Sequence, residues 1–470
     1  MMMKTSFIFM KRFMSIMLSF VLILSGCASG NGFEASQGAS QADAVKSDSL
    51  VKLNFTYWGS QEEKNAIENA CKKFMEQHPG IIINPIQIPN SEYNVKMITM
   101  AAGNDSPDTG YMTGDLGEAW ANEGRFVNLF DMFEKDGKIK KEDFLDYVWF
   151  KRSPDDAWGI STAGECFGLY YNKDLLKAAG IGPLPSKAEE AMEWDQFVKL
   201  AKRLTLDKNG NNAESQEFNP HNIKQYGLMF ETWEEPISNM IFSNGGKWLS
   251  DDGKKFLLNS PESAEAIQKL ADLINVQHVA PSPFSAKSLP TMSVALQAGL
   301  VAMAIGGQWI SLDLANAKVN YDIGVLPKLK KSVTVGLSGA TVLFKSSRYP
   351  GEAWQLFKWM SDPDNAIELY SGGLWMPTLK KWYTDPKLVE KWVDANPAAH
   401  PPGFKDAMMN QLLQNGIPQP LYYMKNSARI VPMVVAGLDP VWLGKKTAAE
   451  ALKEIEEKVR PEIKGRYDAR

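Results

Sequence analysis

The sequence is poor in cysteine and histidine. Of its 470 residues only 3 are Cys and 4 are His. So few cysteines cannot form the disulfide framework of a small secreted domain. The histidines (His78, His221, His278 and His400) are scattered without the spacing of a zinc site. The composition therefore argues against a disulfide-stapled domain and against a zinc enzyme.

The sequence also lacks a strong charge of either sign and a second long apolar run. Its 51 Lys and Arg and 55 Asp and Glu leave a net charge of −4. Without a basic run, nucleic acid is not expected as a partner. The one long apolar run, Phe13 to Leu24, follows Lys11 and Arg12 and is too short to span a bilayer. We therefore interpret residues 1–26 as a signal peptide.

The signal ends on Leu24-Ser25-Gly26-Cys27, which resembles the bacterial lipobox. That resemblance implies a diacylglyceryl-modified Cys27 as the first mature residue, on the extracellular face of the bacterial cell membrane. The alternative is an ordinary secretory signal with an incidental cysteine. Residues 27–49 are rich in Ser, Ala, Gly, Gln and Asp, which predicts a flexible, lipidated tether.

Two cysteines remain beyond the tether. Cys71 falls on the apolar stripe of a predicted helix and Cys166 falls in a predicted strand. This placement predicts two buried free thiols, although a single bridge between them is compatible with an extracellular compartment.

Strands and helices alternate after residue 50. Apolar alternation predicts a strand over 51–57, a helix that stops at Pro79, a strand over 81–88 and a helix that ends at Gly103. This order is typical of an α/β protein with a parallel sheet. Ligands of such sheets bind beyond the carboxyl ends of the strands, where Trp58 and Asp115 are predicted to lie. The later pattern continues with strands over 165–172 and 301–305.

Five segments follow one another in a specific order and spacing. They are Phe74-Met-Glu-Gln-His-Pro-Gly80, Ala101-Ala-Gly-Asn-Asp-Ser-Pro-Asp108, Gly168-Leu-Tyr-Tyr-Asn-Lys-Asp-Leu-Leu176, Gly306-Gly-Gln-Trp309 and Asn320-Tyr-Asp-Ile-Gly-Val-Leu-Pro327. Together they resemble the extracellular solute-binding proteins of sugar importers, the family that includes maltodextrin-binding protein. The resemblance covers nearly all of the chain after the tether.

The resemblance implies an α/β fold of two lobes, each a mixed, mainly parallel sheet flanked by helices, joined by hinge strands. The chain is expected to cross near Gly164, near Ser338 and somewhere in 400–425. Residues 50–164 with 339–405 would form the N-lobe, and residues 165–338 with 406–470 the C-lobe.

The implied protein is not an enzyme and uses no cofactor. It would be a monomer that captures a sugar, expected to be an oligosaccharide, by hinge closure. It would then deliver the sugar to the membrane permease subunits of an ABC importer.

A sugar has apolar faces and a rim of hydroxyls, so aromatic rings and carboxylates hold it. Trp58, Trp233, Trp309 and Trp375 fall at strand ends or glycine turns and are candidate aromatic contacts. Core packing is the alternative for each of them. Asp115 follows a strand, and the resemblance places an acidic ligand contact at Glu165. These six residues are the predicted sugar site.

Other functions remain as alternatives. A secreted glycoside hydrolase or lyase would need two carboxylates at a defined separation. Gly336-Leu-Ser-Gly-Ala340 nearly matches a hydrolase nucleophile elbow but ends in Ala. The same fold could also bind glycerol phosphate or a peptide, although no glycine-rich phosphate motif is present at the predicted cleft.

One segment weakly resembles a calcium loop. Asp207, Asn209 and Asn211 present oxygens at alternate positions, but no acidic ligand closes the loop. A solvent-exposed turn is the preferred interpretation.

Overall fold

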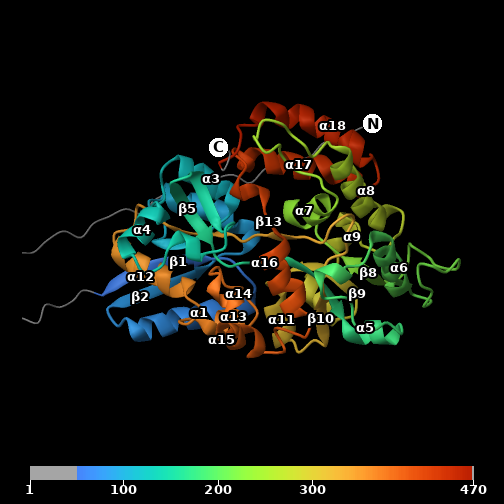
Figure 1. The fold of residues 1–470 in the computed structure, drawn as a ribbon, viewed down its shortest axis with the longest axis horizontal. Helices are drawn as coiled ribbons and strands as arrows, with labels where there is room; N and C mark the ends of the chain where they lie inside the picture. Colours follow the sequence, from blue (N-terminus) through green and yellow to red (C-terminus); the bar gives the residue numbers. More distant parts are fainter. Residues whose placement is uncertain (1–49, 468–470) are drawn as a thin grey trace, which may run out of the picture. The chain divides into compact units, whose positions relative to one another are not determined.

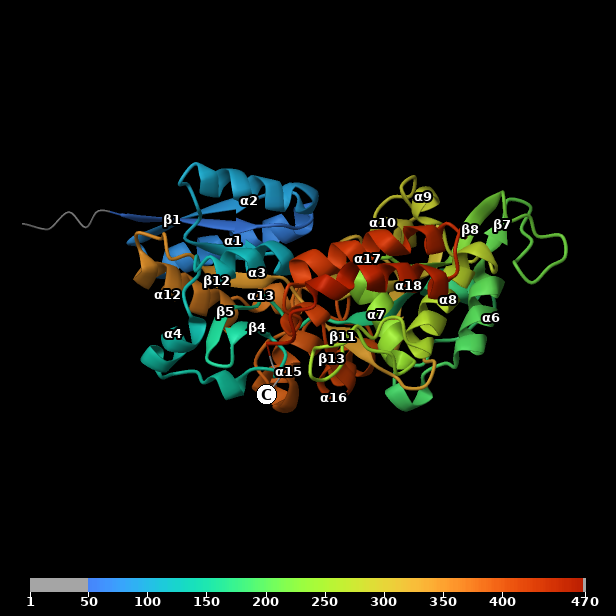
Figure 2. The same cartoon turned by 90° about the horizontal axis from the view of Figure 1, so that it is seen from above.

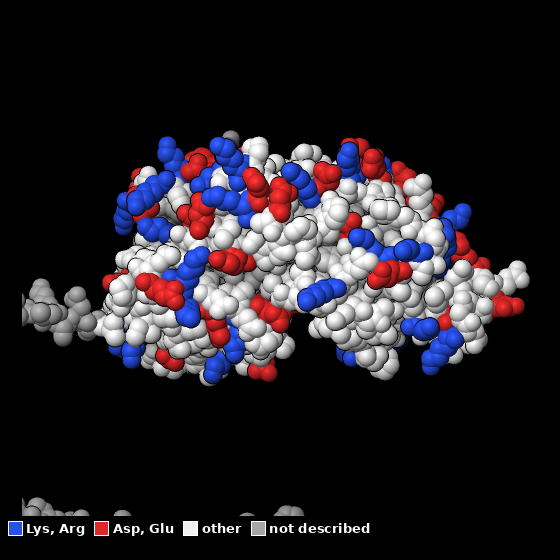
Figure 3. Space-filling model, turned by 90° about the horizontal axis from the view of Figure 1, so that it is seen from below, with Lys and Arg blue, Asp and Glu red and all other residues white. Residues whose placement is uncertain are grey.

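The computed structural model describes residues 50–467. The predicted signal peptide, Cys27 and the predicted tether lie outside this range, so these predictions are not tested by the described residues. Within the range, no helix is long and apolar enough to cross a membrane. Lys and Arg are interspersed with Asp and Glu over the face drawn in Figure 3.

The first sheet is built mainly from the early part of the chain, and the predicted strands at 51–57 and 81–88 are present in it. Strands β1 and β3 and strands β1 and β2 pair in parallel, whereas β12, β5 and β4 add antiparallel pairings. In order across the sheet the strands are β2 (Ile81–Gln87), β1 (Val51–Tyr57), β3 (Thr109–Met112), β12 (Ala340–Leu343), β5 (Asp156–Ser161) and β4 (Trp149–Ser153).

Helices cover this sheet (Figures 1 and 2). The predicted helix before Pro79 is present as α1, which begins with a capping box from Ser60 and buries Ile67, Cys71 and Phe74. The helices of the first lobe are α1 (Gln61–Gln77), α2 (Tyr93–Ala102), α3 (Gly114–Asn122), α4 (Leu129–Asp136), α12 (Pro350–Ser361), α13 (Ile367–Ser371), α14 (Lys381–Thr384) and α15 (Pro386–Val389).

The second sheet is built from the middle of the chain. Strand β6 is central and pairs antiparallel with both neighbours, whereas β8 and β9 are parallel. The strands in order are β10 (Tyr321–Gly324), β6 (Phe167–Asn172), β9 (Val301–Gly307), β8 (Ile223–Met229) and β7 (Leu206–Asp207). The helices are α5 (Lys173–Ala178), α6 (Trp194–Leu204), α7 (Glu234–Ser243), α8 (Pro261–Asn275), α9 (Pro283–Ala286), α10 (Met292–Gln297) and α11 (Ile310–Asn316).

The expected architecture of two mixed sheets flanked by helices is therefore present, but the sheets are not mainly parallel. Among the described strands, antiparallel pairings outnumber parallel ones in the two sheets. In the first sheet, β4 and β5 form a hairpin, and β12 runs antiparallel to both of its neighbours. In the second sheet, β6 runs antiparallel to β10 and β9, and β7 runs antiparallel to β8.

Short segments connect the sheets. The chain leaves the first sheet after β5 and enters the second at β6, and it returns from β11 (Thr334–Gly336) to β12. These two segments pair through Glu165 and Leu337. A third segment, β13 (Gly416–Pro418), runs parallel to β11 after α16 (Gln411–Asn415).

The carboxyl-terminal helices contact helices of both lobes. α17 (Ser427–Trp442) packs against α18 (Ala448–Val459), α8 and α3. At its amino end, Glu118 of α3 accepts hydrogen bonds from the Asn426 and Ala428 N–H groups at 2.6 and 3.2 Å. Ser427 Oγ donates at 2.6 Å and Tyr467 Oη at 2.8 Å. This carboxylate is 5% exposed and ties α17 to the first lobe.

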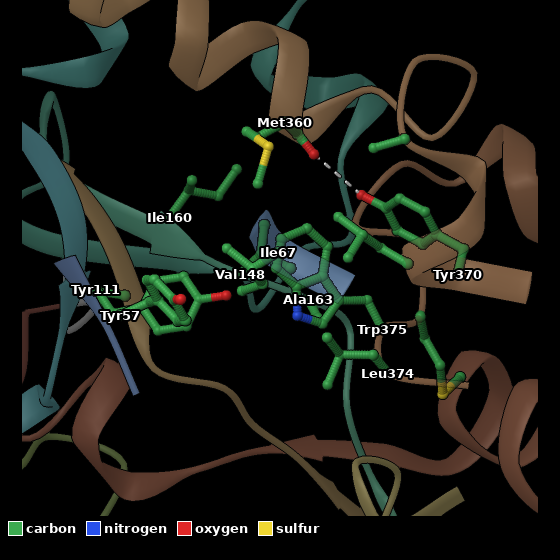
Figure 4. Packing of buried hydrophobic residues seen from close by; sticks show 14 of the residues in the cluster. Tyr57, Ile67, Tyr111, Val148, Ile160, Ala163, Met360, Tyr370, Leu374 and Trp375 are labelled. Atoms are coloured by element: carbon green, nitrogen blue, oxygen red, sulfur yellow. Dashed lines mark hydrogen bonds between the residues drawn. The ribbon is translucent and has the colours of Figure 1, made fainter. Parts of the chain in front are cut away.

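The apolar interior holds both remaining cysteines. Cys71 and Cys166 are buried and free, as predicted, and burial raises the pKa of Cys71 to about 12. Figure 4 shows the packing around Tyr57 and Tyr111 of the first sheet, which lie in the same core as Trp375.

Candidate functional site

Trp58 follows β1 and is half-buried at the carboxyl end of the first sheet. Its ring meets Tyr93 and Tyr111 edge-on, with centroids 4.8 and 5.0 Å away. On another side it meets Gly339, where an added Cβ would lie 2.4 Å from the ring. Gly339 is thus required for this close approach, and the indole is held in one place with part of its surface open.

Glu63 lies beside Trp58 at the start of α1. Ser60 Oγ accepts from the Glu63 N–H at 3.2 Å, and the Glu63 carboxylate accepts from the Ser60 N–H. Glu63 is partly exposed. Its pKa is raised to about 7, mainly by desolvation; the hydrogen bond from the Ser60 N–H opposes the rise, and the charge of Asp313 adds to it. We did not single out Glu63 from the sequence, although the capping box after Trp58 was a usable signal.

Glu165 lies in the first connection between the sheets. Its backbone exchanges two hydrogen bonds with Leu337, at 3.2 and 3.0 Å. The pKa of the Glu165 carboxyl is raised to about 8, mainly by desolvation and also by the charge of Glu63, while a hydrogen bond with Ser338 opposes the rise. Glu165 is also partly exposed. The charge of Glu63 acts on Glu165, and we call the surroundings of these two partly exposed carboxyls the recess.

Desolvation and the charge of Glu63 both disfavour the ionised form of Glu165, so this carboxyl retains its proton near neutral pH. A carboxyl donates a hydrogen bond and a carboxylate accepts one. The pair Glu63–Glu165 can therefore serve both the donor and the acceptor side of a ligand hydroxyl.

The second lobe contributes an aromatic cluster. Trp233 precedes α7, Trp309 precedes α11, and Phe167 begins β6 two residues after Glu165. Ring centroids are 6.5 Å apart for Trp233 and Trp309, and Phe167 lies 6.1 and 5.8 Å from them. An added Cβ at Gly307 would lie 2.1 Å from the Trp309 ring. Both tryptophans are partly exposed, and their rings are inclined by 34° to each other, so they form an angled apolar surface open to a ligand.

Further carboxylates surround this surface. Glu234 and Glu235 form the first turn of α7, and desolvation raises the pKa of both. The charge of Asp115, in the first turn of α3, also raises the pKa of Glu234. Asn94 Nδ2 donates to both Asp115 oxygens at 3.3 Å, and Thr113 Oγ1 donates to Asn94 Oδ1 at 2.8 Å. Asp115 is thus oriented from the first lobe while it acts on a residue of the second.

Direct contacts join α1 and α11 next to this recess. Ser60 Oγ donates to Asp313 Oδ1 at 3.0 Å, and Asn316 Nδ2 donates to Glu62 Oε2 at 2.9 Å. We call these two hydrogen bonds the rim contacts. They connect the amino-terminal end of α1, where Glu63 lies, to α11, the helix that follows Trp309.

The structure thus brings five of the six predicted site residues, Trp58, Asp115, Glu165, Trp233 and Trp309, into one chain of contacts and charge interactions. The sixth, Trp375, is elsewhere. It is 4% exposed and packs on Tyr370 at a centroid distance of 5.8 Å. Figure 4 shows it beside Leu374 and Ala163 in the core. Core packing, the alternative given for each tryptophan, holds at this position, and we leave Trp375 out of the site.

The weak calcium candidate is a hydrogen-bonded turn. Asp207 accepts from the N–H groups of Asn209, Asn211 and Asn219 at 2.8, 2.9 and 3.1 Å. Asn211 Nδ2 donates to it as well, at 3.2 Å. Donors therefore occupy the carboxylate that a cation would need. Asp207 itself is buried, whereas Lys208, Asn209 and Gly210 of the same turn are exposed. In residues 50–467 no group of three or more His, Cys, Asp or Glu side chains could hold a metal ion.

The segment that resembled a nucleophile elbow connects two strands, β11 and β12, whereas an elbow connects a strand to a helix. Ser338 Oγ accepts from the Ala163 N–H at 3.3 Å. His400 is buried between Trp392 and Phe404. The geometry of a serine hydrolase is not present here.

Comparison with known proteins identifies the family. The family model of bacterial extracellular solute-binding proteins matches residues 58–367. The chain belongs to this family. Its two-sheet fold is shared with the ABC substrate-binding protein Lmo0181 from Listeria monocytogenes, solved in complex with cycloalternan. The TM-score is 0.75 at 22% identity, over 88% of this chain and 98% of that one.

Two further proteins are similar to the chain. Maltose-bound MalE3 of T. maritima has a TM-score of 0.70 at 19% identity, over 87% of this chain and 99% of that one. Among curated sequences, the sn-glycerol-3-phosphate-binding periplasmic protein UgpB of Pectobacterium atrosepticum is 23% identical over 427 residues. The match covers 84% of this chain and 88% of UgpB. At these identities the structural likeness shows the fold, and the ligand has to be argued from the site.

Proposed function

We propose that this solute-binding protein captures an uncharged sugar between its two lobes and delivers it to the permease of an ABC importer. The carrying observation is the combination of aromatic surfaces with recessed carboxyls. Trp58 lies on the first lobe and the Trp233–Trp309 surface on the second, with Glu63 and Glu165 along the chain of contacts between them. Aromatic rings against C–H faces and carboxyls against hydroxyls are the contacts that a sugar needs.

The charge of the recess supports an uncharged ligand over a phosphorylated one. No cation is among the groups that shift the pKa values of Glu63, Glu165, Glu234 and Glu235. A phosphate would meet several carboxyls without a counter-charge, which is unfavourable in a desolvated site. The similarity to UgpB nevertheless makes glycerol 3-phosphate the second candidate, and it belongs in the test.

Isothermal calorimetry of the unlipidated mature protein tests the ligand. The panel contains maltose, maltotriose, cycloalternan, tagatose and glycerol 3-phosphate, and products are analysed afterwards. We expect saturable binding of an unchanged sugar, weakened in Trp309→Ala and retained in Phe284→Ala. Phe284 is an exposed aromatic, 79% accessible, that makes none of the ring contacts of the Trp233–Trp309 cluster. Cleaved sugar would instead support a glycoside hydrolase, and binding of glycerol 3-phosphate alone would support the second candidate.

We further propose that Cys27 carries a lipid anchor, that residues 27–49 are the tether and that the protein is a monomer on the extracellular face of the membrane. The lipobox-like sequence supports the anchor. Mass spectrometry of the membrane fraction should find a diacylglyceryl group on Cys27, and Cys27→Ala should release the protein into the medium. An unmodified cysteine would leave an ordinary secreted receptor.

We also propose the lobe boundaries given above, with hinges near Gly164 and Ser338. The change of sheet between β5 and β6, and again between β11 and β12, supports them. Domain motion about these points can be measured by small-angle scattering with and without the sugar.

A further inference from the structure

A second cavity lies at the amino edge of the first sheet, opposite the edge that carries Trp58. Strand β1 begins there and β3 begins there, because the two are parallel. Strand β12 ends there, because it is antiparallel to β3. Between the start of β1, the loop before β3 and the loop after β12 is an open cavity of about 710 Å³. We call it the basic pocket.

Cations predominate in the basic pocket. Lys52, Lys345 and Arg348 line it, are exposed, and take part in none of the ion pairs formed by the described residues. Arg125 also lines it, but its Nε pairs with Glu123 at 2.6 Å. Three unpaired cations on one wall are available to an anion.

The carboxylates of the pocket do not neutralise this wall. They are Asp105 and Asp108. Asp108 is buried, and its two oxygens accept from the Asn54 N–H at 2.8 Å and from Ser347 Oγ at 2.6 Å. Asp108 therefore holds the loops together, and Asp105 is the one exposed acid against the three unpaired cations.

The position of the pocket indicates which anion it meets. The described chain starts at Leu50, which is 53% exposed, and Lys52 is two residues further. If Cys27 is lipidated as proposed, the tether of residues 27–49 would span roughly 25 to 30 Å as a flexible chain. The anchor would hold this edge of the first lobe close to the bilayer, where lipid headgroups reach a high effective concentration.

We propose that the basic pocket binds the phosphate headgroups of anionic membrane lipids. Each cation near an anionic membrane surface contributes to attraction, so three of them act together with the anchor. The aromatic and acidic recess lies at the other edge of the same sheet and stays accessible. The proposal rests on the proposed anchor for the location of the lipid, but the pocket can be tested without it.

Vesicle co-sedimentation of the unlipidated mature protein provides the test. Vesicles of phosphatidylglycerol are compared with vesicles of phosphatidylcholine at about 0.15 M salt. We expect binding to phosphatidylglycerol alone. Lys52→Glu, Lys345→Glu and Arg348→Glu combined should lower it at least about tenfold. The corresponding Gln variants should lower it less, and they serve if the charge-reversed protein does not fold.

The matched control reverses three other exposed lysines without ion pairs, in Lys173→Glu, Lys224→Glu and Lys287→Glu. It makes the same change in net charge on the second lobe and should leave vesicle binding near the wild-type value. An equal loss in the control would overturn the proposal, because net charge alone would explain binding. Equal binding to both lipids, or calorimetric binding of inorganic phosphate without vesicle binding, would also overturn it. Sugar affinity should be unchanged in both triple variants, which keeps this test separate from the proposed function.

Discussion

Glu118 and Glu165 are both carboxyls withdrawn from bulk water, but their surroundings differ. Glu118 is surrounded by donors: two N–H groups at the start of α17, Ser427 Oγ and Tyr467 Oη. Glu165 has one assigned partner, Ser338, and faces the negative charge of Glu63. The fold therefore satisfies the hydrogen-bonding capacity of Glu118 and leaves that of Glu165 available to a ligand. A desolvated, partly exposed acid with few hydrogen-bond partners is the better guide to a ligand site.

The largest expected effect is at Glu118. Replacing it with Gln removes the charge at the amino end of α17 and turns an amide N–H₂ toward N–H donors. We expect a loss of about 3 kcal/mol in the free energy of unfolding. Chemical denaturation of the unliganded protein measures this loss. An unchanged denaturation midpoint would show that the hydrogen bonds to Glu118 do not stabilise the fold.

The next largest effect concerns the aromatic surface. Trp309→Ala removes a partly exposed ring that is held by Phe167 and Gly307. We expect sugar affinity to fall by about 2 kcal/mol, or roughly thirtyfold, with a smaller change in stability. Calorimetry and thermal melts separate the two. A stability loss without an affinity loss would reassign Trp309 to the core.

The same Glu-to-Gln change at position 165 should have the opposite sign to the one at Glu118. The folded-state pKa of Glu165 is raised to about 8, so the folded protein retains a proton that the unfolded chain releases. Stability is therefore highest below the unfolded pKa, near 4.5, and falls as the pH rises toward 8. Glu165→Gln should stabilise the unliganded protein by about 1 to 2 kcal/mol at pH 8 and by almost nothing at pH 4.

Denaturation at both pH values measures that difference, and calorimetry should find weaker sugar binding in the same variant. Stabilisation with loss of binding is the expected combination for a site residue. Destabilisation at pH 8 would instead show that Glu165, like Glu118, stabilises the fold through its carboxylate.

The smallest effect is at the rim contacts. Ser60→Ala removes the cap of α1 and the hydrogen bond to Asp313, and we expect a loss of about 1 kcal/mol in stability. Asn316→Ala removes the other rim contact without touching a helix cap. Scattering should show a more open unliganded protein in both variants if the rim contacts favour closure.

Local pattern was sufficient to predict β1, α1 and its stop before Pro79, because alternation, helical spacing and caps are encoded in neighbouring residues. Local pattern could not predict the direction in which strands pair. The orientation of β12, for example, depends on how the chain returns to the first sheet from the second lobe. Trp375 was misassigned because a glycine turn exposes some tryptophans and buries others. Glu63 and Glu118 were missed because their roles arise from residues far away in the sequence, Asp313 and Ser427 respectively.

Glu165 belongs to a chain segment that connects the sheets, and its backbone is bonded to the other connecting segment at Leu337. On the proposed function, the residue that detects the sugar is also part of the axis about which the lobes turn. No relay of intervening residues is then needed between recognition and movement. A mutation at Glu165 would change the sugar affinity and the equilibrium between the open and closed forms together. A mutation at Trp309 would change the sugar affinity alone.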